Sequence, residues 1–484
     1  METKEWLKAA LENLSRDGVD YADARHLDRE SESITVRNEQ VAGLSRKSDS
    51  GFGIRVLYKG SWGFAASARL TEASVMDTAN RALEVARASY LTQREAVKLD
   101  GSQPQRGSYK SDFEVDPFTV PLDKKLGLLF GALKVLRQDK RIGVAEGSMS
   151  FFRTDKLFLS TEGAEIMQSI MESGAGISAT AMEDGELQRR SYPDSHGGDC
   201  LARGYEFIES LRLVENAEST REEALALLSA EPCPADTTDL IITSSQLGLQ
   251  IHESCGHPTE LDRALGTEIS YAGGSFLTLD KLGKFRYGSK IVNLYGDATI
   301  PGSIGSFGYD DEGVPAQRFP IIKAGIFVGY LTSRETAPIV GGQSTGAMRA
   351  QGWNHIPLIR MVNINLEPGE EDLSLDDLVA DTKDGILVAT NKSWSIDDLR
   401  LNFQFGCEIG WEIKNGKRVR MLKNPVYTGI TPQFWNSCDA ICGRSEWRLW
   451  GLPNCGKGEP PQTMHVGHGT APARFRNTEV GVKK

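Results

Sequence analysis

The sequence lacks long hydrophobic runs, and this absence excludes a class of protein. No stretch reaches the roughly 18 consecutive apolar residues that a membrane-spanning helix needs, so we expect no membrane span. The N-terminal stretch METKEWLKAALENLSRDG has no apolar core either, because Glu2, Glu5 and Glu12 interrupt it. We therefore expect no secretory signal there.

Basic charge and cysteine are also scarce. The 484 residues carry a formal net charge of −11, which argues against a nucleic-acid-binding protein. The seven cysteines are odd in number and widely spaced, unlike the dense pattern of a disulfide framework. We expect a cytoplasmic protein with reduced thiols, any of which could bind a metal.

The apolar pattern predicts an α+β fold with two parts. Residues 1–230 read as an N-terminal mixed α/β domain, in which regions of about 1–92 and 122–230 are joined by a polar, proline-containing connector. Helices are expected at the N-terminus, after an N-cap at Thr71, near 122–138 and over 219–229. Alternating strands fill the rest of this part.

Residues 236–484 are predicted to form a β-rich C-terminal domain. Pro232 and Pro234 end the preceding helix, and DLIIT reads as a buried strand. Beyond residue 265 the chain is glycine-rich, with short strand candidates and one further helical stretch, LSLDDLVADTKDG. The main helix of this domain should carry the sequence HESCGH.

Histidine is scarce, with seven residues in the chain, yet two of them flank a glutamate in the stretch LGLQIHESCGHP. Ser244 or Ser245 could cap the helix, and a stripe of Leu247, Ile251 and Cys255 would face the core. His252, Glu253 and His257 supply two imidazoles and a carboxylate. A hydrolytic zinc site needs these groups, because the imidazoles hold the ion and the carboxylate takes a proton from a water whose pKa zinc lowers to about 7.

A catalytic zinc has three protein ligands and one open position. The residues leave the third ligand open among Glu260, Asp262, His465, His468 and a cysteine. Cys455 is the strongest remote candidate, since it lies in a tight loop, WGLPNCGKGEPP, and a thiolate binds zinc well. Cys255 falls on the apolar stripe and is expected in the core.

The stretch GYDDEGVPAQR, residues 308–318, contains Asp310 and Asp311. Two interpretations of this stretch remain open. These carboxylates could bind a cation or shape a cleft, or the stretch could be a solvated turn.

Several long stretches in a fixed order resemble the TldD branch of the TldD/PmbA (TldE) family of modulators and metallopeptidases. The resemblance covers nearly the whole chain and is carried by HESCGH, GSFGYDDEGVPAQR, STGAMRA, IRMVNINLEPGEEDL, NKSWSIDDLRLNFQFGCEIGW and WGLPNCGKGEPPQTMHVGHGTAPARFRN.

The resemblance implies a zinc-dependent peptidase with the motif H-E-x-x-x-H. It assigns zinc (Zn2+) to His252, His257 and Cys455, and the role of general base to Glu253. It also implies a dimer, formed with a PmbA/TldE-like paralogue or with a second copy, that admits unfolded polypeptides or peptide precursors. Two alternatives remain: a metal-dependent amide hydrolase with a modified substrate, and a non-catalytic binding subunit with a structural zinc.

The spacing of the two histidines raises a geometric problem. In a regular α-helix, five residues turn the chain by about 500°, which leaves His252 and His257 roughly 140° apart. Pro258 cannot donate to the carbonyl of Ser254, and Gly256 makes bending easier. We therefore predict a widened, π-type or kinked turn within 252–258. The alternative is a helix that ends at Gly256, with His257 in the following turn.

Overall fold

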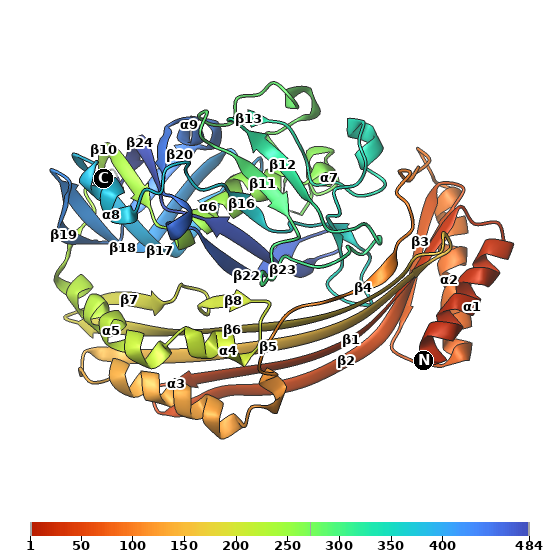
Figure 1. Ribbon diagram of the computed structural model, residues 1–484, viewed down its shortest axis with the longest axis horizontal. Coiled ribbons are helices and arrows are strands. Elements are labelled where there is room, and N and C mark those ends of the chain that lie inside the picture. The colour runs from red at the N-terminus through yellow and green to blue at the C-terminus, as the bar shows by residue number, and fades with distance from the viewer. Residues whose placement is uncertain (1, 272, 483–484) are drawn as a thin grey trace.

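The computed structural model describes residues 2–271 and 273–482. Two large mixed layers make up the molecule, and the C-terminal half lies over one face of a long, curved N-terminal sheet (Figure 1). This arrangement is the predicted α+β fold, with the paired histidines on a helical segment of the β-rich half. No helix of the described residues is long and apolar enough to cross a membrane.

The N-terminal half builds one eight-stranded sheet in the order β3-β2-β1-β5-β6-β4, with β7 and β8 also paired to β6. Its elements are α1 (Glu2–Arg16), β1 (Tyr21–Arg37), β2 (Gln40–Tyr58), β3 (Ser61–Ser67), α2 (Glu72–Tyr90), β4 (Arg106–Lys110), a 3-10 turn (Pro117–Thr119), α3 (Leu122–Leu136), β5 (Ile142–Ser160), β6 (Glu165–Glu183), β7 (Glu186–Tyr192), β8 (Asp199–Leu201), α4 (Tyr205–Ser210) and α5 (Leu213–Ser229).

Two hydrophobic cores support this sheet. Helices α1 and α2 pack on β1 to β3, and α3, α4 and α5 pack on the outer face of β5 and β6 (Figure 1). The helix predictions after Thr71 and at the N-terminus are confirmed, since Thr71 accepts a hydrogen bond from the backbone N–H of Ser74 and the predicted apolar faces are buried. Helix α5 begins earlier than predicted, at Leu213.

The polar stretch between α2 and α3 is more ordered than its composition indicates. Within it, β4 pairs in parallel with β6, from Arg106 opposite Glu165 to Lys110 opposite Ser169. Strand β4 alternates exposed and half-buried residues, and for that reason it carries no apolar pattern that sequence analysis could detect.

The C-terminal half contains a second eight-stranded sheet in the order β17-β10-β24-β20-β18-β19-β9, with β21 paired to β24. The elements up to the middle of this half are β9 (Glu231–Pro232), β10 (Asp236–Ile242), α6 (Ser244–Ile251), η2 (His252–Gly256), η3 (His257–Thr259), α7 (Leu261–Ala264), η4 (Leu279–Lys281), β11 (Leu294–Asp297), β12 (Arg318–Lys323), β13 (Ile326–Phe327), η5 (Ala337–Val340), β14 (Met348–Arg349), β15 (Leu358–Ile359) and β16 (Ile364–Leu366).

The remaining elements complete that sheet and add a separate hairpin, β22 with β23. They are α8 (Leu375–Ala380), β17 (Asp384–Ile396), β18 (Asn402–Lys414), β19 (Lys417–Lys423), β20 (Val426–Ile430), α9 (Thr431–Asn436), β21 (Cys438–Ile441), η6 (Arg444–Glu446), β22 (Arg448–Lys457), β23 (Gln462–Thr470) and β24 (Ala473–Val480). Helix α8 lies in the predicted LSLDDLVADTKDG stretch, where Ser374 and Asp377 form a capping box.

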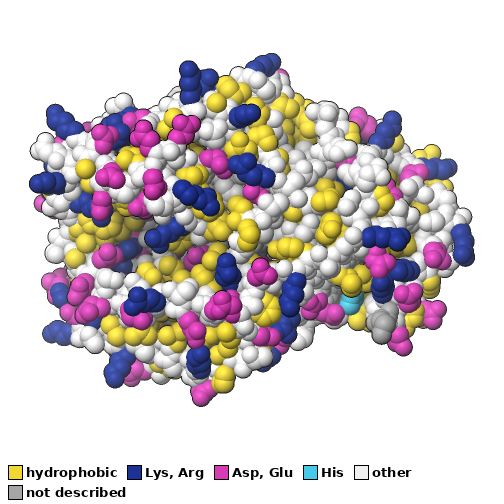
Figure 2. Space-filling view, in the orientation of Figure 1, with side chains coloured by type: hydrophobic (Ala, Val, Ile, Leu, Met, Phe, Trp, Pro, Cys, Tyr) yellow, Lys and Arg dark blue, Asp and Glu magenta, His cyan; other side chains and the backbone are white. Residues whose placement is uncertain are grey.

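The surface mixes charges of both signs. Figure 2 shows Lys and Arg side chains interspersed with Asp and Glu over the visible face, between patches of apolar side chains. This face therefore presents no continuous field of one sign.

Candidate metal centre

Helix α6 starts directly after the buried strand β10, and its N-cap is Thr243. The predicted caps, Ser244 and Ser245, are wrong by one or two positions. Ser244 is already helical, and its hydroxyl lies 3.2 Å from the indole nitrogen of Trp450, from which it accepts a hydrogen bond. The Ser244 hydroxyl, which the local sequence assigned to capping, therefore takes part in a tertiary hydrogen bond with Trp450 instead.

The turn that carries the two histidines is a π-helix, from His252 to Gly256. The backbone N–H of His257 bonds to the carbonyl of His252, five residues earlier. A 3-10 turn, His257–Thr259, follows it. The predicted widening is confirmed, and the two histidines face one another because each π turn holds more residues than an α turn.

Neighbouring hydroxyls satisfy the carbonyls that this distortion frees. Tyr287 donates to the Ser254 carbonyl at 2.9 Å, the carbonyl to which Pro258 has no N–H to offer. Thr259 donates to the carbonyls of Cys255 and Gly256 at 2.8 and 2.9 Å. The turn is thus a stable feature of the core, since buried carbonyls need partners.

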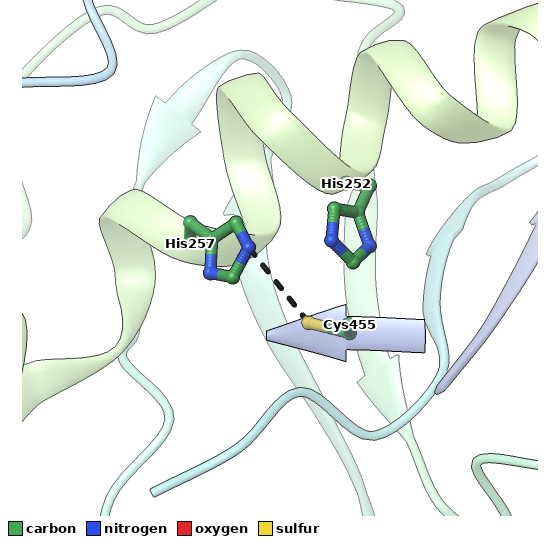
Figure 3. A group of neighbouring side chains, drawn as sticks. All are labelled: His252, His257 and Cys455. Carbon is green, nitrogen blue, oxygen red and sulfur yellow. Dashed lines mark hydrogen bonds between the residues drawn. The ribbon is translucent and has the colours of Figure 1, made fainter. Parts of the chain in front are cut away.

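Cys455 completes a group of three side chains whose chemical types can hold a metal ion. It lies on β22 and points toward the helical turn, as Figure 3 shows. Its sulfur is 3.8 Å from Nε2 of His257, and one ligand atom from each of His252, His257 and Cys455 lies within 4.8 Å of the others. All three residues are buried, with exposed fractions of 2 to 4%.

These residues suit a zinc ion in both chemistry and spacing. Two imidazoles and one thiolate are borderline-soft ligands, which zinc prefers. Bond lengths of about 2.0 to 2.3 Å in a tetrahedron place ligand atoms about 3.3 to 3.6 Å apart. The observed group is slightly wider, so small side-chain shifts would bring it to coordination distance.

The Nδ1 atom of His257 has a carboxylate partner. It donates to Oε2 of Glu260 at 3.1 Å, which leaves Nε2 with its lone pair toward Cys455. Glu260 is fully buried, and its charge is balanced by Lys457, 3.5 Å away. A carboxylate behind a histidine fixes the ring and its tautomer in many zinc sites. Glu260, left open above as a ligand, occupies this supporting position.

His252 is oriented by a relay through His468. A backbone carbonyl only accepts, so the 3.0 Å contact between Nδ1 of His468 and the Ile364 carbonyl places a hydrogen on that Nδ1. Nε2 of His468 then accepts from Nδ1 of His252 at 2.9 Å. This relay leaves Nε2 of His252 unprotonated and able to bind a metal.

The other candidates from the sequence lie elsewhere. His465 contacts Glu172 of β6 at 2.7 Å, and Asp262 pairs with Lys457 at 2.8 Å. Asp310 accepts hydrogen bonds from backbone N–H groups of its own loop and from that of Met348. Asp311 accepts from Lys156 of β5 at 2.6 Å. The stretch 308–318 thus anchors the C-terminal half on the first sheet.

Burial keeps the imidazoles neutral. It lowers the pKa of His252 to about 4 and that of His257 well below its usual value, and it lowers the pKa of His468 to about 3. Neutral imidazoles are the form that binds metals.

The two cysteines near the turn differ in the direction in which the protein shifts their thiol pKa. Burial alone raises the pKa of a thiol, yet the net shift of the Cys455 pKa is downward, and the nearby cationic Arg360, which donates to the Cys455 carbonyl, favours its thiolate form. Cys255 faces the core, where burial raises its thiol pKa. Only Cys455 of this pair is therefore prepared to act as a thiolate.

Glu253 lies on the same turn as the histidines and is 5% exposed. Oε2 of its carboxylate accepts a hydrogen bond from Nη1 of Arg400 at 2.5 Å. Arg400 and Arg360 were missed by sequence reasoning. Arg400 belongs to the quoted stretch NKSWSIDDLRLNFQFGCEIGW, but nothing in its local pattern distinguishes it from a surface arginine.

Two parts of the chain match one family. Residues 235–481 match the PmbA/TldA metallopeptidase C-terminal domain, and residues 22–86 match PmbA/TldA metallopeptidase domain 1. These matches include the helical turn, the β22–β23 hairpin and the first strands of the N-terminal sheet.

Similar proteins align over nearly the full length. The chain is 31% identical to a metalloprotease of Methanocaldococcus jannaschii, over 93% of this chain and 94% of that protein. It is 26% identical to a metalloprotease TldD homolog of Haemophilus influenzae, over 97% and 94%. It is 25% identical to a zinc metalloprotease TldD homolog of Saccharolobus solfataricus, over 96% and 97%.

Solved structures share the fold. A candidate modulator of a DNA gyrase from Thermotoga maritima superposes with a TM-score of 0.78 at 17% identity, over 99% of this chain and 100% of that one. TldE from Thermococcus kodakarensis gives 0.72 at 16%, over 98% and 100%. At these identities the likeness concerns the fold alone.

Proposed function

The chain belongs to the PmbA/TldD family of metallopeptidases and is a hydrolase, and from this premise we propose that it is a zinc peptidase of the TldD type. Its zinc ligands are His252, His257 and Cys455, and Glu253 is the general base. Its substrates are unfolded polypeptides or peptide precursors, whose peptide bonds it hydrolyses with a zinc-activated water.

The observation that carries this proposal is the convergence of two neutral imidazoles and one cysteine thiol of lowered pKa from positions about 200 residues apart. The name of the Saccharolobus solfataricus relative, a zinc metalloprotease, supports zinc as the metal. Three protein ligands would leave a fourth position free on a bound zinc, and such a free position distinguishes catalytic from structural zinc sites.

Each residue has a defined part in the chemistry. A bound zinc supplies Lewis acidity, which acidifies a water and polarises a peptide carbonyl. Glu253 would accept a proton from the attacking water and pass it to the leaving amine, as a general base that then acts as an acid. Glu260 and His468 hold the two imidazoles in the tautomers that binding requires.

Burial of the centre supports an extended substrate. The three proposed ligands and Glu253 are nearly inaccessible, so a flexible chain would reach them more easily than the surface of a folded protein. We further propose a cytoplasmic dimer. The likeness to TldE supports a PmbA/TldE-like partner, and a second copy of this chain is the other possible partner.

The test separates metal binding from catalysis. Glu253→Gln should keep near-stoichiometric zinc and lose hydrolysis of an unfolded polypeptide by several orders of magnitude, because the general base is removed. Metal content and proteolysis, with and without chelator, are measured on the same preparations. Loss of zinc together with activity would instead make Glu253 a ligand.

Cysteine variants provide the matched control for the ligand set. Cys455→Ala should weaken zinc binding strongly, whereas Cys255→Ala should leave it nearly unchanged, because Cys255 lies in the core and its thiol pKa is raised. The ligand assignment is wrong if zinc content follows Cys255.

A further inference from the structure

The charged side chain of Arg400 lies beside the proposed general base, Glu253. The function described so far gives Arg400 no role. Its Nη1 donates to Oε2 of Glu253 at 2.5 Å. The two side chains are 15% and 7% exposed, so water screens this ion pair only weakly. The pair therefore fixes the direction of the Glu253 carboxylate.

The backbone at Arg400 is held in an unfavourable conformation. Its φ is +64°, in the left-handed region that non-glycine residues rarely adopt. The turn between β17 and β18 enforces it, because the N–H of Arg400 bonds to the Asp397 carbonyl at 2.9 Å and that of Leu401 bonds to the Asp397 carboxylate at 2.7 Å. Thr431 donates to the Arg400 carbonyl at 3.0 Å.

One donor of the Arg400 guanidinium, its Nε–H, has no hydrogen-bond partner among the described residues. Its Nε–H is buried, and no atom of residues 2–271 or 273–482 accepts a hydrogen bond from it. A buried donor without a partner destabilises the folded state. A strained backbone and an unpaired donor thus occur together at the residue whose guanidinium contacts Glu253. This pattern is typical of functional sites.

We propose that Arg400 is a positioning residue for the peptidase reaction: its guanidinium holds the Glu253 carboxylate in the orientation from which it accepts the proton. This inference rests on the proposed function of Glu253. Because a displacement of about 1 Å at a reacting group can cost about 10²-fold in rate, loss of this contact should reduce kcat while substrate binding changes little.

The experiment compares Arg400→Ala and Arg400→Lys with the wild-type chain, using a quenched fluorogenic peptide. Arg400→Ala should lower kcat about 10²-fold, with KM within about threefold and zinc content unchanged. Arg400→Lys keeps the charge but loses the planar fork, so its kcat should lie between the two. Added guanidinium ion at millimolar concentration should restore kcat of Arg400→Ala at least severalfold.

Controls separate positioning from stability. Guanidinium should not raise the rate of wild type, of Glu253→Gln, or of Arg221→Ala, whose arginine lies in the N-terminal half and is 10% exposed. Absence of hydrolysis by the wild-type chain overturns the proposed function itself. With an active wild type, the role of Arg400 is overturned if kcat of Arg400→Ala stays within about threefold, or if neither guanidinium nor the lysine variant recovers any of the loss.

Discussion

At the residue scale, the two histidines of the metal centre depend on partners that are not themselves proposed ligands. Glu260 accepts from His257, and His468 accepts from His252 while it donates to the Ile364 carbonyl. Each contact fixes one tautomer. Glu260 and His468 therefore fix the orientation and the tautomer of the two proposed histidine ligands.

His468→Ala should weaken zinc binding about 10- to 100-fold, the usual effect of removing such a supporting residue. The change removes the acceptor for Nδ1–H of His252, so the ring loses its orientation. Competition with a chelating dye measures the affinity. His465→Ala is the matched control and should have little effect, because His465 contacts Glu172 and lies outside the group of three. Equal affinities for His468→Ala and wild type would exclude the relay.

At the element scale, the π turn of η2 and the strand β22 form the centre together. The turn brings His252 and His257 to a ring separation of 4.8 Å, and β22 supplies Cys455. A shape constraint helps to hold the turn, since Gly256 packs directly on the side chain of Met361, which is fully buried. A side chain at residue 256 would meet the Met361 side chain, so either the turn or that side chain would have to move.

Gly256→Ala should impair the metal centre without unfolding the protein. Its added methyl carbon would lie 2.0 Å from Sδ of Met361, well inside van der Waals contact, so either the sulfur or the turn must move. We expect reduced zinc content and about 10-fold or greater loss of peptidase activity. The double variant Gly256→Ala with Met361→Ala provides the needed space and should recover part of the zinc. If Gly256→Ala alone binds zinc normally, the close packing does not constrain the ligands.

At the scale of the whole molecule, buried polar contacts connect the first sheet to the C-terminal half. Glu408 of β18 accepts from Arg190 at 2.9 Å and from both the backbone and the hydroxyl of Ser191, on β7. Asp199 of β8 accepts from the N–H of Gly451 on β22 at 2.8 Å. The strand that carries Cys455 is thus tied to the N-terminal sheet.

Glu408→Ala should destabilise the protein by about 3 to 5 kcal/mol, because it leaves Arg190 and Ser191 with unpaired buried donors. The midpoint of chemical denaturation and the rate of limited proteolysis measure the change. Glu412→Ala, four residues along the same strand, removes a more exposed pair with Arg420 and should cost less than about 1 kcal/mol. Similar decreases in the free energy of unfolding for both variants would show that the buried contact stabilises the protein no more than the exposed pair does.

Asp199 predicts a pH dependence of stability. Burial raises its pKa from 3.8 to about 7 in the folded protein. Between about pH 4 and 7 the folded state therefore binds more protons than the unfolded state, so the contribution of Asp199 to stability falls as pH rises through this window. Asp199→Asn keeps an oxygen acceptor for Cys200 and Gly451 but does not ionise.

The melting temperature of Asp199→Asn should therefore exceed that of wild type most clearly above pH 7, and the difference should shrink toward pH 4. Thermal melts of both proteins across this range measure it. A difference that is constant with pH would show that the carboxyl does not titrate in this window.

The sequence by itself determined the local features. Apolar periodicity placed the helices at the N-terminus and after Thr71, because each buries one face on a sheet. The spacing of His252 and His257, with Gly256 and Pro258 between and after them, predicted the widened turn, because helix geometry is a local property. The residues made Cys455 the strongest remote candidate for the third ligand but left the choice open, and the resemblance to a family then assigned that ligand to Cys455.

Only the tertiary structure decided what surrounds these residues. The contacts of His468 with His252 and of Arg400 with Glu253 join positions 216 and 147 residues apart, and no local pattern encodes such distances. The same reason explains why β4 escaped sequence analysis, since its partner β6 lies in a distant part of the chain and supplies the hydrogen bonds that make it a strand. Local sequence sets the shape of a turn, but the electrostatic environment of a side chain depends on the whole fold.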